Sequence, residues 1–277
     1  MNIGIGSYCL TWSIGVNGWP LPACPMQAID LLDLAISAGA DRVQLADNLP
    51  LDKLTTQALH QLADKAEKSG MPIEIGLRGS EPERLLEYLS IAGTLKAGLV
   101  RTLLTERDLG ICREHLSSVL PLYAAAGVTL ALENHGLHSS SELAGLIDGL
   151  RKSMAATEAA LIGCCLDTVN SFGSLEGPEQ VIRNLAPLAV NLHLKDFTIR
   201  RHTHQMGFEI IGTPAGQGRL DIPTLLKTVR ESAWAAGRQA PGIILELWVP
   251  WQGDIDATIH VERQWLAESL EWLHELS

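Results

Sequence analysis

Short apolar segments with strand character alternate with longer segments of helical spacing eight times along the 277-residue chain. The predicted strands are Ile3–Cys9, Arg42–Ala46, Ile73–Leu77, Leu99–Leu104, Val128–Leu132, Ile162–Leu166, Asn191–Leu194 and Gly242–Leu247. The predicted helices are Met26–Ala38, Leu51–Lys68, Glu81–Ala97, Glu106–Ala126, Ser141–Ala160, Pro178–Leu185, Ile222–Ala236 and Asp256–Leu276. Runs that are apolar almost throughout are typical of parallel strands covered on both faces. Eight strand–helix units in about 250 residues predict an α/β fold with one (β/α)8 barrel domain over residues 1–277.

An open, doubly wound sheet is the alternative fold for such an alternation. It usually carries a G-x-G-x-x-G turn after its first strand, and this chain has SYCLTW there instead. Ser80 with Glu83 and Ser139 with Glu142 have the spacing of a capping box, which predicts helix starts at these points. The long connection Asp196–Arg219 follows the seventh strand, and connections of this length in compact folds are usually functional.

Charge and cysteine content narrow the class of protein. The chain has 21 Lys and Arg against 32 Asp and Glu, a formal charge of −11, which disfavours binding to nucleic acids or anionic membranes. No apolar run approaches the ~18 residues needed to cross a bilayer, and the first residues do not resemble a signal peptide. The 5 cysteines include one adjacent pair and no C-x-x-C, so we expect no disulfide framework and a cytoplasmic location.

Four consecutive predicted strands end in a side chain that can bind a metal ion. These side chains are Glu133, Asp167, His193 and Glu246. Because neighbouring strands lie about 4.8 Å apart, the four ends can converge on one point of the barrel mouth. Three unpaired carboxylates would repel one another there, and a divalent cation removes that conflict. Oxygen ligands with one imidazole suit Mn²⁺, Mg²⁺, Co²⁺ or Zn²⁺.

The segments around these residues carry a resemblance to a known family. They read ALENH, CLDTVN, HLKDF and ILELW. With these motifs the chain resembles the xylose isomerase-like TIM-barrel superfamily, which includes sugar phosphate isomerases and epimerases. The resemblance covers nearly the whole chain. It implies one divalent metal ion, often Mn²⁺, held by Glu133, Asp167, His193 and Glu246. It also implies that Glu133 and Glu246 are the two acid/bases, as in the ketose 3-epimerases.

One position departs from this pattern. Many epimerases of the superfamily have a histidine three residues after the aspartate of the sixth strand, and this chain has Asn170. We expect Asn170 and His135 to contact the substrate. Lys195 and Arg200 follow the seventh strand with Arg201 and His204, and this cationic group indicates an anionic substrate, either a sugar phosphate or a sugar acid.

Aromatic side chains follow the first and the last predicted strands. Trp12 comes after the first strand and Trp248 after the eighth. These two strands are neighbours in a closed barrel, so we expect the two rings to form one wall of the substrate pocket.

The expected chemistry starts from a keto-sugar whose ketone and neighbouring hydroxyl bind the metal ion, which stabilises an enediolate. Glu133 and Glu246 can then move protons on its two faces, which predicts an isomerase or epimerase. The same intermediate can form by loss of CO₂ or water. The alternative is therefore a lyase, such as a decarboxylase of a 3-oxo sugar acid of the 3-oxo-isoapionate type or a dehydratase like the inosose dehydratases. A small sugar or sugar acid is the expected partner, and a homo-oligomer is possible.

Overall fold

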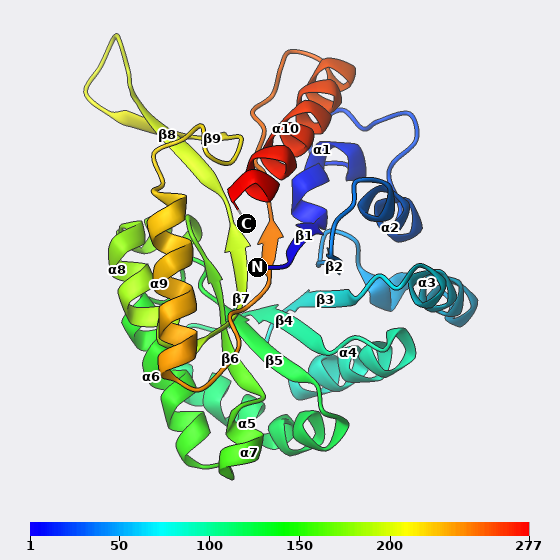
Figure 1. Ribbon diagram of the computed structural model, residues 1–277, viewed down its shortest axis with the longest axis vertical. Helices are drawn as coiled ribbons and strands as arrows, with labels where there is room; N and C mark the ends of the chain where they lie inside the picture. The colour runs from blue at the N-terminus through cyan, green and yellow to red at the C-terminus, as the bar shows by residue number, and fades with distance from the viewer. Residues whose placement is uncertain (277) are drawn as a thin grey trace.

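Eight parallel strands close into a barrel in the order β1-β10-β7-β6-β5-β4-β3-β2 (Figure 1). The computed structural model describes residues 1–276. The barrel strands are β1 (Ile3–Gly6), β2 (Arg42–Leu45), β3 (Ile73–Arg78), β4 (Leu99–Leu103), β5 (Thr129–Glu133), β6 (Ile162–Asp167), β7 (Ala189–Leu194) and β10 (Ile243–Leu245). The predicted (β/α)8 barrel is confirmed.

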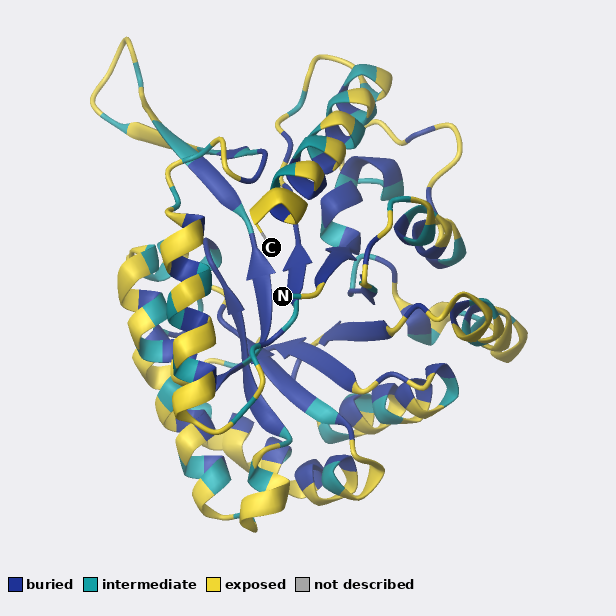
Figure 2. Cartoon of the chain, viewed as in Figure 1, coloured by how far each residue is buried: buried dark blue, intermediate teal, exposed yellow. Residues whose placement is uncertain are grey.

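Helices surround the barrel and turn their apolar sides toward it (Figure 2). They are α1 (Thr11–Ile14), α2 (Ala28–Ser37), α3 (Thr56–Ser69), α4 (Pro82–Leu95), α5 (Leu109–Ala126), α6 (Ser140–Lys152), α7 (Ala156–Ala159), α8 (Pro178–Leu185), α9 (Ile222–Ala235) and α10 (Ile255–Leu276). The single helix predicted over Ser141–Ala160 is wrong, because α6 ends before Ser153 and the separate turn α7 follows. None of the described helices is long and apolar enough to cross a bilayer.

The inside of the barrel is unusually polar, and this decides where chemistry can occur. Successive strand residues point alternately into the barrel and out toward the helices. The outward residues belong to the main apolar core, whereas buried polar side chains lie inside. Glu74 accepts hydrogen bonds from Arg42, Gln44 and Asn191 at 2.6, 3.1 and 2.8 Å. A polar interior of this kind can hold charged groups at the carboxyl ends of the strands.

The first strand is shorter than predicted. β1 ends at Gly6, and Ser7–Leu10 forms a 3-10 turn that leads into α1. Glu262 of α10 explains the change, because its carboxylate accepts hydrogen bonds from the backbone N–H groups of Trp12 and Ser13 at 2.8 and 2.9 Å. It also accepts one from the Ser13 hydroxyl at 2.7 Å. Glu262 thus satisfies the free N–H groups at the start of α1.

Glu262→Ala is expected to lower the free energy of unfolding by about 2–4 kcal/mol, because it leaves buried donors without an acceptor. Denaturant unfolding followed by circular dichroism measures the effect. Glu271→Ala, at an exposed position of the same helix, is the matched control. Equal stability of the two variants would contradict the anchoring role of Glu262.

The long connection after β7 folds into a hairpin that stands out from the barrel (Figure 1). Its antiparallel strands are β8 (Asp196–Arg201) and β9 (Phe208–Thr213). The carboxylate of Asp196 accepts hydrogen bonds from the backbone N–H groups of Gly216, Gly218 and Leu220 at 2.8–3.1 Å. These bonds fix the turn by which the chain returns to α9.

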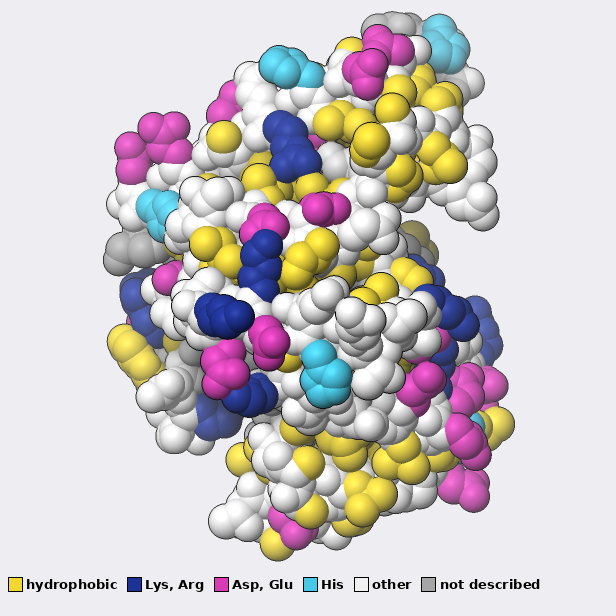
Figure 3. Space-filling view, turned by 90° about the vertical axis from the view of Figure 1, so that its right-hand side faces the viewer, with side chains coloured by type: hydrophobic (Ala, Val, Ile, Leu, Met, Phe, Trp, Pro, Cys, Tyr) yellow, Lys and Arg dark blue, Asp and Glu magenta, His cyan; other side chains and the backbone are white. Residues whose placement is uncertain are grey.

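The helices α2, α3 and α4 lie on the face that Figure 3 shows. Basic and acidic side chains are mixed on that face. Ion pairs join neighbouring helices. Lys65 of α3 pairs with Asp33 of α2, and Lys96 at the end of α4 pairs with Glu67 of α3. This face therefore offers no continuous basic surface for a polyanion.

Candidate metal centre

Four neighbouring strands deliver the predicted metal ligands to one end of the barrel. Glu133 and Asp167 are the last residues of β5 and β6, His193 is near the end of β7, and Glu246 directly follows β10. In the register of the barrel, Asp167 pairs with His193, and the Glu246 N–H bonds to Leu194 of β7. The strand pairing therefore places Asp167 beside His193 and Glu246 just beyond it, whereas Glu133 pairs with Cys165, two residues before Asp167.

The four side chains lie together and are buried. Nδ1 of His193 is 3.2 Å from Oε1 of Glu246 and 3.7 Å from Oε1 of Glu133. One ligand atom from each of Asp167, His193 and Glu246 lies within 4.8 Å of the other two. All four residues are at most 5% exposed. The spacing of these ligand atoms suits a single cation between them.

Unsatisfied polar atoms support this interpretation. Neither ring nitrogen of His193 has a hydrogen-bond partner among the described residues, and the same holds for Oε1 of Glu246. Buried polar atoms are normally hydrogen-bonded, and exceptions call for a missing ligand or water. Carboxylate oxygens and a neutral imidazole nitrogen are ligands for Mn²⁺, Mg²⁺, Co²⁺ and Zn²⁺, so the residues fit such an ion.

Lys195 lies inside the carboxylate cluster. Its Nζ is 2.8 Å from Oδ2 of Asp167 and 2.8 Å from Oε2 of Glu246. The side chain is 13% exposed, so the ammonium group borders the barrel mouth. The sequence predicted Lys195 as a substrate-binding residue, and the structure adds that it contacts two of the predicted metal ligands.

Arg101 is a charged residue of the site that our sequence analysis did not single out. It comes from the middle of β4, is 1% exposed, and places its Nε 2.8 Å from Oε2 of Glu133. Its Nη1 is 3.0 Å from Oδ1 of Asp47, which in turn binds Arg78 and Tyr8. An arginine inside the apolar run LVRTLL was the available signal, because buried charges are rare unless paired.

Arg101→Met is expected to lower the free energy of unfolding by about 3–5 kcal/mol, since it leaves the buried carboxylates of Glu133 and Asp47 without their cation. Chemical denaturation measures this loss. The double variant Arg101→Met/Glu133→Gln should lose less than the single variant, because one uncompensated charge is gone. Arg107→Met, at an exposed position, is the control. A double variant that loses as much as the two single variants together would show that Arg101 and Glu133 are not coupled.

The pKa values of the site follow from burial and from these ion pairs. Burial raises the pKa of Glu133, but Arg101 and His193 outweigh this effect and hold it well below its usual range. Burial lowers the pKa of Lys195, but Asp167 and Glu246 outweigh it and raise the pKa well above its usual range. Glu133 is therefore a carboxylate and Lys195 an ammonium ion at neutral pH.

Asn170 links the two sides of the cluster. Its Nδ2 donates to Oε1 of Glu133 at 2.8 Å, and its Oδ1 accepts from Nζ of Lys195 at 3.2 Å. The side chain at this position, where many epimerases have histidine, thus orients both residues. A substrate contact of Asn170 stays a prediction.

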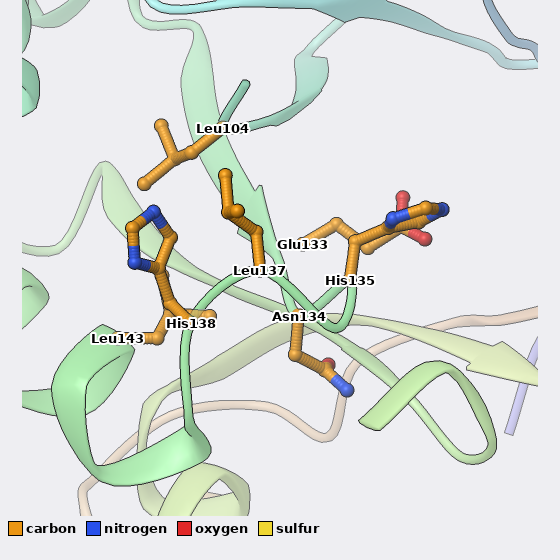
Figure 4. A pocket seen from close by; sticks show the side chains of 7 residues that line it. All are labelled: Leu104, Glu133, Asn134, His135, Leu137, His138 and Leu143. Carbon is orange, nitrogen blue, oxygen red and sulfur yellow. The ribbon is translucent and has the colours of Figure 1, made fainter. Parts of the chain in front are cut away.

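His135 is exposed, two residues beyond Glu133. Figure 4 shows its ring and the Glu133 carboxylate pointing to the same side of the loop, away from Leu104 and His138. Both residues line a small pocket together with Leu104, Leu137 and His138. The predicted substrate contact of His135 stays a prediction.

The two predicted tryptophans have different surroundings. Trp12 is buried and donates its indole N–H to the Val249 carbonyl at 2.7 Å, and its ring centroid lies 5.3 Å from that of Trp251 with the two planes tilted by 46°. Trp248 is 37% exposed and donates to the Asp196 carbonyl at 3.1 Å. Trp12 lies in α1, which follows β1, and Trp248 lies in the loop that follows β10.

Arg200 lies on the hairpin rather than within the cluster. Its guanidinium is 2.9 Å from the Glu209 carboxylate of β9, and its side chain is 69% exposed. The structure therefore brings Lys195 to the metal ligands but does not bring Arg200 to them.

The comparisons with known proteins agree with the barrel fold described above. The family model for the xylose isomerase-like TIM barrel matches residues 32–276. The chain is 28% identical to the 3-oxo-isoapionate decarboxylase of Pectobacterium atrosepticum, over 99% of this chain and 95% of that protein.

Solved structures show the same fold at low sequence identity. A D-psicose 3-epimerase crystallised in the presence of D-fructose superimposes with a TM-score of 0.69, at 15% identity, over 99% of this chain and 97% of that one. A xylose isomerase-like TIM barrel protein from Mycobacterium smegmatis in complex with magnesium gives a TM-score of 0.57, at 14% identity, over 84% of this chain and 86% of that one.

Proposed function

The chain belongs to the xylose isomerase-like TIM-barrel family, and from this premise we propose that it is a metal-dependent carbon–carbon lyase that decarboxylates a 3-oxo sugar acid. The observation that carries the proposal is the position of Lys195, whose ammonium group lies 2.8 Å from both Asp167 and Glu246. Decarboxylation needs one well-placed proton donor and no base that removes a proton from carbon. The relative from Pectobacterium, which matches nearly the whole chain, is a decarboxylase of this class.

The balance of charge in the cluster favours an anionic substrate. Three carboxylates, Glu133, Asp167 and Glu246, face two buried cations, Arg101 and Lys195. A divalent cation changes this balance from one negative to one positive charge, with His193 neutral. A buried site with net positive charge binds a substrate that carries a carboxylate more tightly than it binds a neutral sugar.

The metal ion is the finer part of this proposal. We propose Mn²⁺ held by Asp167, His193, Glu246 and Glu133, because oxygen-rich sites with one imidazole suit it. When bound, the ion would supply electrophilic stabilisation of the negative charge that develops on the substrate's keto oxygen.

The residues of the chain then account for the proton transfer. The bond between the carboxyl carbon and its neighbour breaks, CO₂ leaves, and the electron pair stays on the substrate as an enolate. Lys195 donates a proton to the carbon that lost CO₂, and a divalent cation that neutralises Asp167 and Glu246 would remove the interactions that raise the pKa of this ammonium group. Since its side chain is 13% exposed, it can regain that proton from water at the barrel mouth.

Epimerisation or isomerisation of a keto-sugar is the second candidate. It is favoured by two carboxylates, Glu133 and Glu246, that lie 3.7 and 3.2 Å from Nδ1 of His193 and could serve as the pair of acid/bases such a reaction needs. Glu133 is a weak base here, however, because Arg101 and His193 lower its pKa. This is why we rank the lyase first.

Proton NMR in heavy water separates the two candidates. Purified protein is incubated with a set of 3-oxo sugar acids and keto-sugars, with and without Mn²⁺. A decarboxylase releases CO₂ and leaves one deuterium on the carbon that carried the carboxylate. An epimerase exchanges a carbon-bound proton for deuterium and keeps every carbon. Deuterium exchange without any loss of CO₂ would overturn the lyase proposal.

A further inference from the structure

A second group of metal-binding side chains lies next to the first. One ligand atom from each of Glu133, Cys165 and His193 lies within 4.8 Å of the other two, and all three residues are buried. Cys165 precedes Asp167 by two residues on β6, so this group sits one step deeper in the barrel. The group differs from the first in containing a sulfur atom.

The strand geometry directs Cys165 and not its neighbour into the barrel. Cys165 pairs in register with Glu133 of β5, and its Sγ is 3.3 Å from Oδ1 of the interior residue Asn191. The pairing of β6 with β7 shifts its register between Cys164 and Cys165, and the contacts of the two residues differ: Cys164 belongs to the main apolar core, whereas Cys165 does not. The adjacent cysteine pair thus provides one sulfur for the barrel interior and one matched control.

Polar atoms near the sulfur lack hydrogen bonds. Both ring nitrogens of His193, which is fully buried, have no hydrogen-bond partner among the described residues. Oε2 of Glu133 is 2.8 Å from Nε of Arg101 but forms no hydrogen bond of acceptable geometry. A fully buried imidazole in this condition indicates a ligand that the side chains themselves do not supply.

We propose that Glu133, Cys165 and His193 form a second metal position, selective for thiophilic divalent cations such as Zn²⁺ and Cd²⁺. Thiolate ligands select soft cations, whereas Mn²⁺ and Mg²⁺ prefer the oxygen ligands of Asp167 and Glu246. Binding releases the thiol proton to solvent, so the ion has two anionic ligands, the thiolate and the Glu133 carboxylate. The proposal rests on the proposed metal centre, with which it shares His193 and Glu133.

This sharing has a functional consequence. The two positions compete for the same imidazole, so a thiophilic ion bound at Cys165 excludes a cation from the oxygen-rich position. Zn²⁺ and Cd²⁺ therefore inhibit the enzyme by occupying the deeper position instead of replacing Mn²⁺ in place.

Titration with Cd²⁺ alone tests the deeper position directly, because a cadmium–thiolate bond absorbs in the ultraviolet. The parent protein carries Cys24→Ser, which removes the exposed cysteine. We expect the absorption band in this parent and in its Cys164→Ser derivative, with one Cd²⁺ bound per chain. Cys165→Ser and Cys165→Ala should both lose the band, and circular dichroism verifies that each variant is folded. A band of equal intensity in a folded Cys165 variant, or no band in the parent, would overturn the proposal.

Glu246→Gln separates this proposal from the proposed function. Glu246 belongs to the oxygen-rich position only, so the variant should lose Mn²⁺ binding, followed by electron paramagnetic resonance, and keep the Cd²⁺ band. In the parent, Cd²⁺ should release bound Mn²⁺, and in Cys165→Ser this release should require a higher Cd²⁺ concentration. Loss of the Cd²⁺ band in Glu246→Gln would show that only one position exists. Failure to release CO₂ from any sugar acid would refute the lyase and leave these metal results unaffected.

Discussion

Glu246→Gln is expected to reduce kcat/KM by roughly 10²–10³-fold or more, the range for losing one group that stabilises charge in the transition state. Glu246 lies 3.2 Å from His193 and 2.8 Å from Lys195, so its charge holds both the cation position and the ammonium group. The amide keeps the shape of the side chain and removes only the charge. Turnover with Mn²⁺ and a responsive sugar acid measures the loss.

The fold should survive this substitution. The Lys195 ammonium pairs with both Asp167 and Glu246, so it keeps one carboxylate partner when glutamine removes the charge of Glu246. The thermal unfolding midpoint of the metal-free variant should therefore stay close to that of the metal-free protein without the substitution. Glu271→Gln, on the exposed side of α10, is the control for the loss of one acidic charge. Full activity of Glu246→Gln would remove its proposed role.

The barrel and the convergence of Glu133, Asp167, His193 and Glu246 could be predicted from the sequence because both depend on local patterns. Apolar strand runs alternate with amphipathic helices. The runs of the barrel strands β5, β6, β7 and β10 each lead to a polar residue, such as Glu133 or Asp167. Parallel strands of a barrel share one carboxyl end, so adjacency in sequence order becomes adjacency in space. The remaining step is the pairing of β1 with β10, which closes the barrel.

The ion pairs that set the charge of the site could not be predicted from local sequence patterns. Arg101 lies on β4 and meets Glu133 only because the barrel interior brings their side chains together, which no short spacing in the sequence reports. Arg200 is near Lys195 in sequence, but the hairpin carries it away to Glu209. Long-range pairing decides both outcomes.

Helix capping shows the same limit on a smaller scale. The capping box of Ser139 and Glu142 is confirmed. The one predicted for Ser80 and Glu83 is wrong, because α4 begins at Pro82 with Glu81 as its N-cap. The Ser80 hydroxyl instead lies 3.3 Å from Nδ1 of His115 on α5, a tertiary contact that replaces the local one.

Lys195→Met is expected to lower kcat by about 10²–10⁴-fold, the usual contribution of a positioned general acid. The proposed mechanism gives Lys195 the only proton transfer to carbon, and methionine fills a similar volume without a proton to donate. Lys195→Arg keeps the positive charge but holds its proton too tightly to transfer it. The arginine variant should therefore bring KM toward the value of the parent while kcat stays low. Steady-state kinetics on both variants measures this separation, with Lys227→Met at an exposed position of α9 as the control.

Metal affinity shows whether such a loss is chemical or structural. The Lys195 ammonium pairs with the same carboxylates, Asp167 and Glu246, that are proposed to hold the divalent cation. Removing it takes away a competing positive charge, so Mn²⁺ should bind Lys195→Met at least as tightly as it binds the parent. An inactive variant with intact Mn²⁺ binding places the defect in proton transfer. If Lys195→Arg were instead as active as the parent, the proton would have to come from another group, and the epimerase candidate with Glu133 and Glu246 as acid/bases would become the better account of this site.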